Sequence, residues 1–368
     1  MSEALDRVVE DGSLNFYYVG ELWYDGIRRL VDVPLTDTKL AEDDNRAVKT
    51  TGSCQVVWAD DIGQSILPRE IGDIFSPFGS EIAVYAIVEL GGYSERIPMG
   101  WFQITDVPEM RDETMFWENR TITTGSTLTL DLMDRYVQVV NDEFDVPTAP
   151  TDLTSVWAEI GRITGLQLVR SIPDTPITRS VAYKDSVSEA VMDLADILGG
   201  VPYMTRDGAL SMRSKVWPQP VGTLRMGDGG QIVSIGKAMS SDGVYNRVVF
   251  RGQGDRQDQV LSVSEVLSGP LRTKNPDGSR SPAHRRPTFR SNQFVTTKEQ
   301  AQAYTDNELT RVRTLNAQKW PITMTWDPRQ EVGQVWNVVD EQNETTVVRI
   351  ISIDRDTGPT QKVVVVRG

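Results

Sequence analysis

The sequence predicts a mainly β protein that contains one small α+β module. Runs rich in aromatic and β-branched residues recur between residues 14 and 132, each bounded by turn residues and with no long helical pattern between them. Two capped helical patterns follow between residues 151 and 200. Strand-like runs return after residue 217 and continue to the end of the chain. This order predicts β units on either side of the module.

The first β unit is placed in residues 1–147. In the run 81–90, apolar residues occupy both alternating faces, which predicts a strand that is covered on both sides. In the run 121–132, Leu128 and Leu130 share one face and threonines share the other. Strands at this spacing favour an antiparallel barrel or sandwich.

Residues 148–216 predict the α+β module. Thr151 or Asp152 can cap a first helix, because a side-chain oxygen at that position accepts a bond from the free amides of the first turn. The apolar stripe of this helix runs through 153–163, and Gly165 suits the position that follows it.

A second helix is predicted to begin after Ser186. This residue and Glu189 form a capping-box pattern, in which two side chains satisfy free amides of the first turn reciprocally. Two glycines at 199–200 end the helix. The pair Asp207-Gly208 then predicts the turn of a β-hairpin.

The remaining chain is divided into residues 217–330 and 331–368, both rich in strands. Within the first part, the segment 268–293 is rich in Pro, Ser, Asn and Arg and predicts a long exposed loop. A helix with a weaker apolar stripe is predicted from residues 296–297 to about Val312.

The formal net charge of −14 is unevenly distributed. Residues 1–147 carry 28 acidic and 11 basic side chains, a net charge of −17, whereas the remainder carries 24 acidic and 27 basic side chains, a net charge of +3. Such polarity suits head-to-tail or ring assembly with charged neighbours, although a solvated acidic surface explains it equally well. Sequence-specific DNA binding is disfavoured for so acidic a protein.

One surface signal is unusual: a basic loop in which six cations accompany a single acid, Asp277. These candidate interaction residues are Arg272, Lys274, Arg280, Arg285, Arg286 and Arg290. Such a loop can dock onto an acidic neighbour, for example the N-terminal region of another subunit, or contact DNA that passes through a channel. The alternative is a mobile loop whose arginines are incidental.

The composition disfavours the common kinds of catalytic and metal centre. Cys54 is the single cysteine, so no intrachain disulfide can form, and its strand-like surroundings predict a buried thiol. The single histidine, His284, lies among prolines and arginines without a nearby acid, which disfavours a zinc site or a serine–histidine–acid triad. We therefore predict no catalytic, cofactor-binding or metal-binding residues and no enzymatic activity.

Other motifs have simpler structural explanations. The glycine-rich pieces 226–232 and 251–256 match neither phosphate-binding pattern and predict turns between strands. The acidic clusters 42–44 and 60–61 lack the ligand spacing of a calcium loop and are expected to be solvated. Packing in a core or interface is favoured over a sugar-binding platform for three aromatic residues: Trp23, Tyr24 and Trp101.

Three motifs stand in a distinctive order: SPFGSEIAVY (76–85), ERIPMGWFQITDV (95–107) and LDLMDRYVQVVNDEFDVP (130–147), which contains the pair Asp134-Arg135. The helix VWAEIGRITG, the block AYKDSVSEAVMDLADILGGVPYMTRDGAL and a final pair of strands follow. In this order the chain resembles the minor tail proteins that act as tail hubs in long-tailed phages of actinobacteria. The resemblance covers most of the chain.

The resemblance implies a trimeric hub, similar to the hubs of contractile-tail baseplates, in which each subunit contributes two tube-protein-like β-barrels. The first barrel is then residues 1–147, and the second combines segments of 217–330 with 331–368. The implied partners are the distal tail protein ring, the tape-measure protein and tip fibre or spike proteins, with genomic DNA in contact only in passing. The implied location is the virion tail tip, after assembly in the host cytoplasm and without stable membrane insertion.

We therefore expect a structural subunit that closes the tail tube, joins it to fibres or a spike and leaves a channel for DNA. An acidic barrel lining is expected to keep DNA phosphates from adhering. Two alternatives remain: a tail-associated carbohydrate or cell-wall hydrolase that works through paired acids, and a host-surface-binding β module. A trimeric ring favours the hub, whereas a monomer that degrades a polysaccharide favours the hydrolase.

Overall fold

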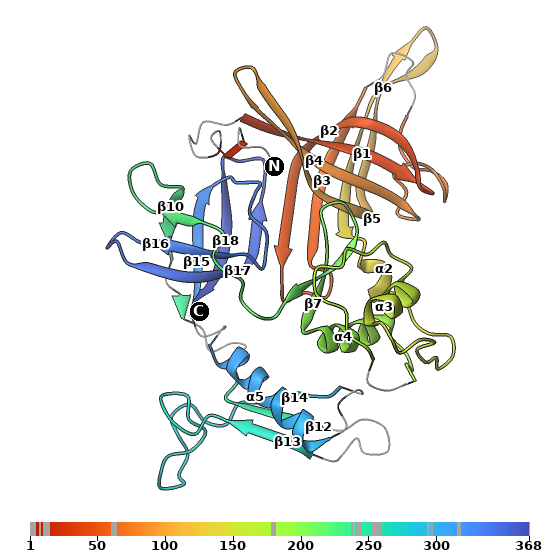
Figure 1. Ribbon diagram of the computed structural model, residues 1–368. Coiled ribbons are helices and arrows are strands. Elements are labelled where there is room, and N and C mark those ends of the chain that lie inside the picture. The colour runs from red at the N-terminus through yellow and green to blue at the C-terminus, as the bar shows by residue number, and fades with distance from the viewer. Residues whose placement is uncertain are drawn as a thin grey trace.

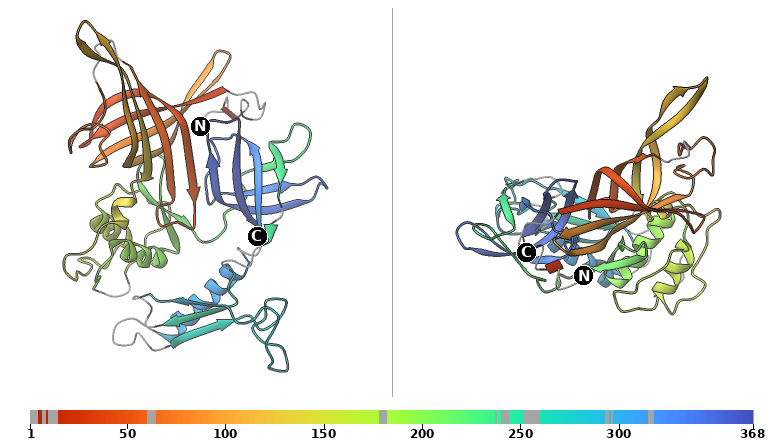
Figure 2. Two further views of the ribbon diagram at one scale, coloured as in Figure 1. Left: turned by 180° about the vertical axis from the view of Figure 1, so that it is seen from behind. Right: turned by 90° about the horizontal axis from the view of Figure 1, so that it is seen from above.

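The computed structural model describes residues 5–6, 9, 15–59, 65–177, 182–236, 238–239, 244–251, 260–292, 295, 297–314 and 318–367. Figure 1 shows four parts. Two β units lie beside each other, and an α+β module lies next to the N-terminal one. A small sheet with one helix lies at the opposite end of the molecule from the N-terminal β unit. Figure 2 shows the same separation from behind and from above. The protein is mostly β, as the sequence predicts. None of the described helices is long and apolar enough to span a membrane.

Six N-terminal strands pair in a closed circuit, which we call barrel 1. The pairs are β1–β4, β4–β5, β5–β6, β6–β3, β3–β2 and β2–β1, all antiparallel. Closure leaves each strand with a neighbour on both sides. The strands are β1 (Asn15–Tyr24), β2 (Ile27–Asp43), β3 (Thr50–Trp58), β4 (Ser80–Leu90), β5 (Tyr93–Trp117) and β6 (Arg120–Asp134).

Alternation along each strand fills the interior of barrel 1. In β4, Ile82 and Val84 are fully buried, whereas Tyr85 on the opposite face is half-buried beneath the guanidinium of Arg96, 4.0 Å from its ring centre. The sequence predicts that both faces of this strand are covered. The inner face is buried, whereas the outer face is only partly covered. Cys54 lies inside, at 1% exposure, and burial raises the pKa of its thiol to about 12.

The α+β module follows barrel 1 and has its own core around Trp157. Its first longer helix begins later than predicted. Ser155, not Thr151 or Asp152, is the N-cap, because its side chain accepts a bond from the amide of Ala158. The elements are α2 (Val137–Val140), α3 (Val156–Thr164), α4 (Val187–Leu198), β7 (Gly200–Met204) and β8 (Leu210–Ser214).

Several other predicted signals of the module are confirmed, including the Ser186 half of the capping-box pattern. Ser186 caps α4 by accepting a bond from the amide of Glu189 at 3.3 Å. Gly165 and Gly199 end their helices in the left-handed conformation, at φ of +63° and +68°, which glycine adopts without steric cost. Strands β7 and β8 form the predicted hairpin, with Gly208 at φ of +77° in its turn.

A second β unit contains the C-terminal strands. Its order is β9–β16–β17–β18–β15–β10, with β11 also beside β15, and one isolated bridge between Met226 and Ile232 links its two ends. The glycine-rich piece 226–232 is the turn between β9 and β10, as predicted. The strands are β9 (Thr223–Arg225), β10 (Ile232–Ile235), β11 (Ala238–Met239), β15 (Gln318–Thr325), β16 (Val335–Val339), β17 (Thr345–Arg355) and β18 (Thr360–Arg367).

Residues 244–314 leave the second β unit and form what we call the basic module. Strand β12 lies between antiparallel β13 and parallel β14, and α5 packs on this sheet through contacts such as the edge-on pair Phe250 and Tyr304, whose ring centres are 5.2 Å apart. The segment 268–293 is therefore not one long loop, because it contains β14. The predicted helix is confirmed as α5. The elements are β12 (Arg247–Arg251), β13 (Val260–Glu265), β14 (Pro287–Arg290) and α5 (Lys298–Thr314).

Barrel 1 and the second β unit are joined by direct strand pairing. Residues 40–43 of β2 pair antiparallel with residues 352–355 of β17, so both units belong to one 13-stranded sheet. These two segments are about 310 residues apart in the chain. The junction therefore depends on contacts between residues that are far apart in the sequence.

Candidate functional site

The motifs 76–85, 95–107 and 130–147 meet where the α+β module docks on barrel 1. Arg135 forms a bidentate ion pair with Glu81, in which Nε donates to Oε1 at 2.8 Å and Nη2 donates to Oε2 at 2.5 Å. Its guanidinium lies 4.6 Å from the ring centre of Trp101, whose Nε1 donates to Glu81 Oε2 at 2.9 Å. Arg135 also donates to the carbonyl of Gly208 at 3.3 Å, which ties the hairpin turn to the barrel.

Close approach explains the glycine in that turn. A Cβ added to Gly208 would lie 2.9 Å from the Cβ of Trp101, and the residue has positive φ. Trp101 in turn packs on Trp23 with ring centres 5.1 Å apart. Both tryptophans therefore pack against neighbouring residues, as the sequence predicts.

Asp134, the neighbour of Arg135, is a buried carboxyl at 2% exposure. Its Oδ2 accepts a bond from the amide of Thr50 at 2.7 Å, and its Oδ1 accepts one from the amide of Tyr136 at 2.9 Å. Burial raises its pKa to about 6, and the two amides only partly offset this rise.

The raised pKa of Asp134 predicts a pH-dependent stability. A carboxyl whose pKa is higher in the folded state stabilises the protein at low pH, and this contribution is lost as pH rises from about 4 through about 6. We expect wild type to lose roughly 2–3 kcal/mol relative to Asp134→Asn between pH 4 and pH 7, at about 1.4 kcal/mol per pKa unit. Urea unfolding across this range measures the difference.

The control for this prediction is Asp152→Asn. The carboxyl of Asp152 is exposed, and bonds from the amide and hydroxyl of Thr154 lower its pKa. Wild type should therefore gain stability relative to this variant as pH rises, the opposite sign. A flat difference between wild type and Asp134→Asn would contradict the assignment.

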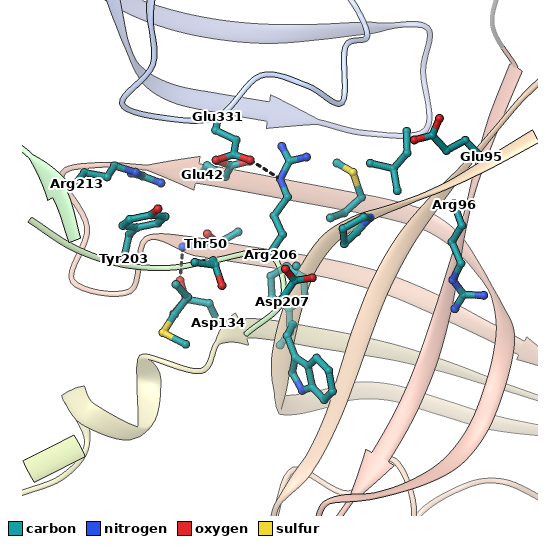
Figure 3. Close-up of a pocket in the computed structure, with 18 residues that line it drawn as sticks. Glu42, Thr50, Glu95, Arg96, Asp134, Tyr203, Arg206, Asp207, Arg213 and Glu331 are labelled. Carbon is teal, nitrogen blue, oxygen red and sulfur yellow. Dashed lines mark hydrogen bonds and ion pairs between the residues drawn. The ribbon is translucent and has the colours of Figure 1, made fainter. Parts of the chain in front are cut away.

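A cavity of about 510 Å³ lies where barrel 1, the hairpin β7–β8 and the loop before β16 meet. Figure 3 shows that charged side chains of these three parts point into it. Arg206 donates to the carbonyls of Pro328 at 2.6 Å and Gln330 at 2.8 Å, and its Nε lies 3.3 Å from Glu331 Oε1. Arg213 lies 3.2 Å from Asp44 Oδ1. Both arginines therefore bind other parts of the protein: Arg206 links the hairpin to the loop before β16, and Arg213 links the hairpin to the end of β2.

The deepest part of this network centres on Arg355, whose side chain is 1% exposed. It donates to Glu42 Oε1 at 2.6 Å, to the carbonyl of Gln330 at 2.6 Å and to Gln361 Oε1 at 3.2 Å. Burial acts against the charged form of Glu42, but Arg355, Arg206 and other nearby cations outweigh burial and lower its pKa. The ion pair therefore bridges β2 and β17 as a salt bridge within the sheet junction.

An aromatic contact reinforces the same junction. Trp326, which follows β15, belongs to the core of barrel 1 and is 1% exposed. Its ring stacks on Phe16 with centres 3.9 Å apart and planes at 9°, and its Nε1 donates to the hydroxyl of Tyr18 at 3.2 Å. The second β unit thus inserts a side chain into barrel 1, which makes independent movement of the two units unfavourable.

The six predicted interaction residues lie together on the basic module but in different environments. Arg290 pairs with Glu308 at 2.9 Å, and Arg272 donates to Asn275 Oδ1 at 2.9 Å. Arg286 is half-buried, and the remaining three side chains, Lys274, Arg280 and Arg285, are exposed. A role in binding stays a prediction for all six.

Sequence reasoning missed the residues that hold the junction. The cluster 42–44 was expected to be solvated, but Glu42 is buried and Asp44 pairs with Arg213, so this expectation is wrong. Its position at the end of a long strand, where a charged run interrupts alternation, is the only signal that could have indicated a structural role. The cluster 60–61 and most of 251–256 lie outside the described residues. Elsewhere in the described ranges, no three His, Cys, Asp or Glu side chains are grouped so as to hold a metal ion.

Known proteins resemble this chain in structure, but the comparisons of sequence find no match. No protein-family model matches this chain, and a search of curated proteins finds no match. Among solved structures, a tail protein from Neisseria meningitidis superposes with a TM-score of 0.59 at 14% identity, covering 96% of this chain and 97% of that one. The 43 kDa tail protein of prophage MuSo2 from Shewanella oneidensis gives 0.57 at 13% identity, covering 95% and 98%.

A chain of the Francisella PdpA–VgrG complex is also similar. It superposes with a TM-score of 0.51 at 6% identity and covers 96% of this chain but 58% of that one. Identities this low show a shared fold and nothing finer. The order of barrel, α+β module and second β unit in this chain is therefore a fold that phage tail proteins also adopt.

Proposed function

We propose that this chain is a structural subunit of a phage tail tip and forms a trimeric hub. The fold shared with two tail proteins over nearly their whole lengths supports a tail component. The observation that carries the proposal is the pairing of β2 with β17, which makes one continuous sheet from two β units. Three such subunits would place six β units around an axis, as a sixfold tube requires.

Each predicted domain has a proposed role in the ring. Residues 1–147 and the strands of 217–330 and 331–368 would form the ring, and 148–216 would brace it. The proposed partners are the distal tail protein ring above, the tape-measure protein within, and fibres or a spike below. The location is then the virion tail tip, with genomic DNA in contact only as it passes through a central channel.

One face of the continuous sheet suits the wall of that channel. Strand pairing brings outward-facing residues of five strands onto a common surface across the junction of the two units. This face carries Thr127, Thr129 and Asp131 of β6, Ser53 and Gln55 of β3, Lys39 of β2, Asp354 of β17 and Lys362 of β18. Short polar side chains are common on this face, which also carries a third acid, Asp43, opposite Ser352, and the exposed apolar side chains of Val57 and Met133.

The acidic lining that composition suggests stays a prediction, and the charged residues named on this face are three acids and two lysines. Binding to DNA grows with the number of phosphates that cations neutralise. A face with no net positive charge offers DNA little to adhere to.

The mass of the purified full-length protein tests the proposal. Three copies of the 41.1 kDa chain give about 123 kDa, and we expect this species in mass photometry and in analytical ultracentrifugation. Images should show a ring with a central hole. A protein that stays monomeric at concentrations up to about 10 µM, where an obligate assembly has formed, would contradict the hub. Hydrolysis of a polysaccharide by that monomer would favour an enzyme instead.

A further inference from the structure

The basic module differs in charge from the rest of the chain. Residues 244–314 carry 12 basic and 7 acidic side chains, a net charge of +5, in a chain whose total is −14. Residues 1–147 carry −17. Opposite charges on two parts of one chain favour contact between copies related by rotation, because every copy then offers both surfaces.

The cations best placed for such a contact are Lys274, Arg280 and Arg285, which we call the basic platform. All three are exposed, and no ion pair joins any of them to another residue in the described part of the chain. The nearby acid Asp277 accepts bonds from the amide and hydroxyl of Ser279 at 2.9 and 2.6 Å, and its single charge is outnumbered by the three cations of the platform. The positive charge of the platform is therefore available to a partner.

The backbone beneath the platform is held in place by one buried side chain. Asn246 is 1% exposed. Its Nδ2 donates to the carbonyls of Leu271 at 3.1 Å and His284 at 2.6 Å, and its Oδ1 accepts a bond from the amide of Arg286 at 2.8 Å. A surface whose backbone is already ordered loses less conformational entropy when it binds.

The platform is remote from barrel 1 of its own chain. The basic module is attached near the C-terminal end of α4, where Asp196 accepts bonds from Asn292 at 3.3 Å and Tyr304 at 3.4 Å. Figures 1 and 2 show the α+β module between the basic module and barrel 1. Acidic residues of barrel 1 that meet the platform must therefore belong to another molecule.

We propose that the basic platform binds exposed acidic side chains of residues 1–147 in a neighbouring copy of this chain. This contact rests on the proposed ring and names how adjacent subunits recognise each other. DNA fits the platform less well, because the basic module lies apart from the strands whose outer face is proposed to line the channel. Contacts of this kind act mainly on the rate and specificity of association and weaken as salt rises.

Zero-length cross-linking with a carbodiimide tests the contact directly, because it joins an amine to a carboxylate only where the two touch. Lys274 is the only amine of the platform. In a mixture of isotope-labelled and unlabelled protein, we expect it to link to an Asp or Glu of residues 1–147 on the other copy. Links only within one chain, or only to acids outside that range, would overturn the proposal.

Charge reversal gives a second readout. The triple variant K274E/R280E/R285E is expected to associate at least about tenfold more weakly than wild type at 50 mM salt, with unchanged thermal unfolding. The control is K298E, an exposed lysine on the same module, which should associate like wild type. Unchanged association of the triple variant would overturn the contact but leave the ring standing, whereas a wild type that never associates would overturn both. Lost DNA binding with unchanged association would assign the platform to nucleic acid and overturn the proposal.

Discussion

The Glu42→Ala variant is expected to lose about 3–5 kcal/mol of unfolding free energy, because removing one partner of a buried ion pair leaves the other charge uncompensated. Arg355 would keep its bonds to Gln330 and Gln361 but lose the carboxylate that accepts a bond from its Nη1. Urea unfolding at pH 7 measures the loss. Since the pKa of Glu42 is lowered, its contribution is present above the ordinary range of a glutamate and is lost as pH falls through the folded value. The penalty should therefore shrink in acid.

Two controls separate burial from charge. Glu113→Ala removes an exposed partner of Arg111 and should change stability by less than about 1 kcal/mol. The double variant Glu42→Leu with Arg355→Met removes both charges together and should cost less than Glu42→Ala alone. If Glu42→Ala lost no more unfolding free energy than Glu113→Ala, the ion pair between Glu42 and Arg355 would not hold the junction.

Trp326→Ala is expected to cost about 3–5 kcal/mol, the usual range for truncating a large buried aromatic side chain. The variant removes the stack on Phe16 and leaves a hole in barrel 1, although Trp326 itself follows a strand of the second β unit. The two units should then unfold in separate steps, which calorimetry detects as a broadened or double transition.

Trp326→Phe is the matched control. It keeps an aromatic ring against Phe16 but loses the bond to the Tyr18 hydroxyl, so its main cost is about 1 kcal/mol for that bond plus a smaller loss of packing. We expect a single transition. A double transition already present in wild type would contradict the rigid coupling of the two units.

Local signals predicted the elements well where the chain pattern alone decides them. The capping residue Ser186 and the glycine at 199 mark the two ends of α4, and alternation in the run 81–90 marks β4. The turn at Gly208 was also predicted, although its closeness to Trp101 was not. These features depend on neighbours in sequence, where periodicity and turn chemistry are informative.

Long-range pairing was beyond such reasoning. Nothing near residue 42 indicates that Arg355, 313 residues away, will neutralise it. Nothing around Asn246 marks it as the residue that orders a distant basic segment, so 268–293 was taken for an open loop. The start of α3 was placed too early because Thr151, Asp152 and Ser155 are all suitable caps, and packing of Trp157 decides among them.

The charge distribution illustrates the same limit of composition. An excess of acid in residues 1–147 predicts an acidic channel lining, which stays a prediction; the outward face of β3 and β6 carries mainly threonine, serine and glutamine. Composition counts charges but does not assign them to a face. Strand register does, because each residue alternates between the interior and the outer surface.

A reconstruction of the purified assembly by electron cryomicroscopy tests the central claim most directly. The account predicts three copies with six β units around one hole, and Ser53, Thr129 and Asp354 on the wall of that hole. A threefold ring with these residues on its outer surface, or particles that contain a single copy, would contradict it.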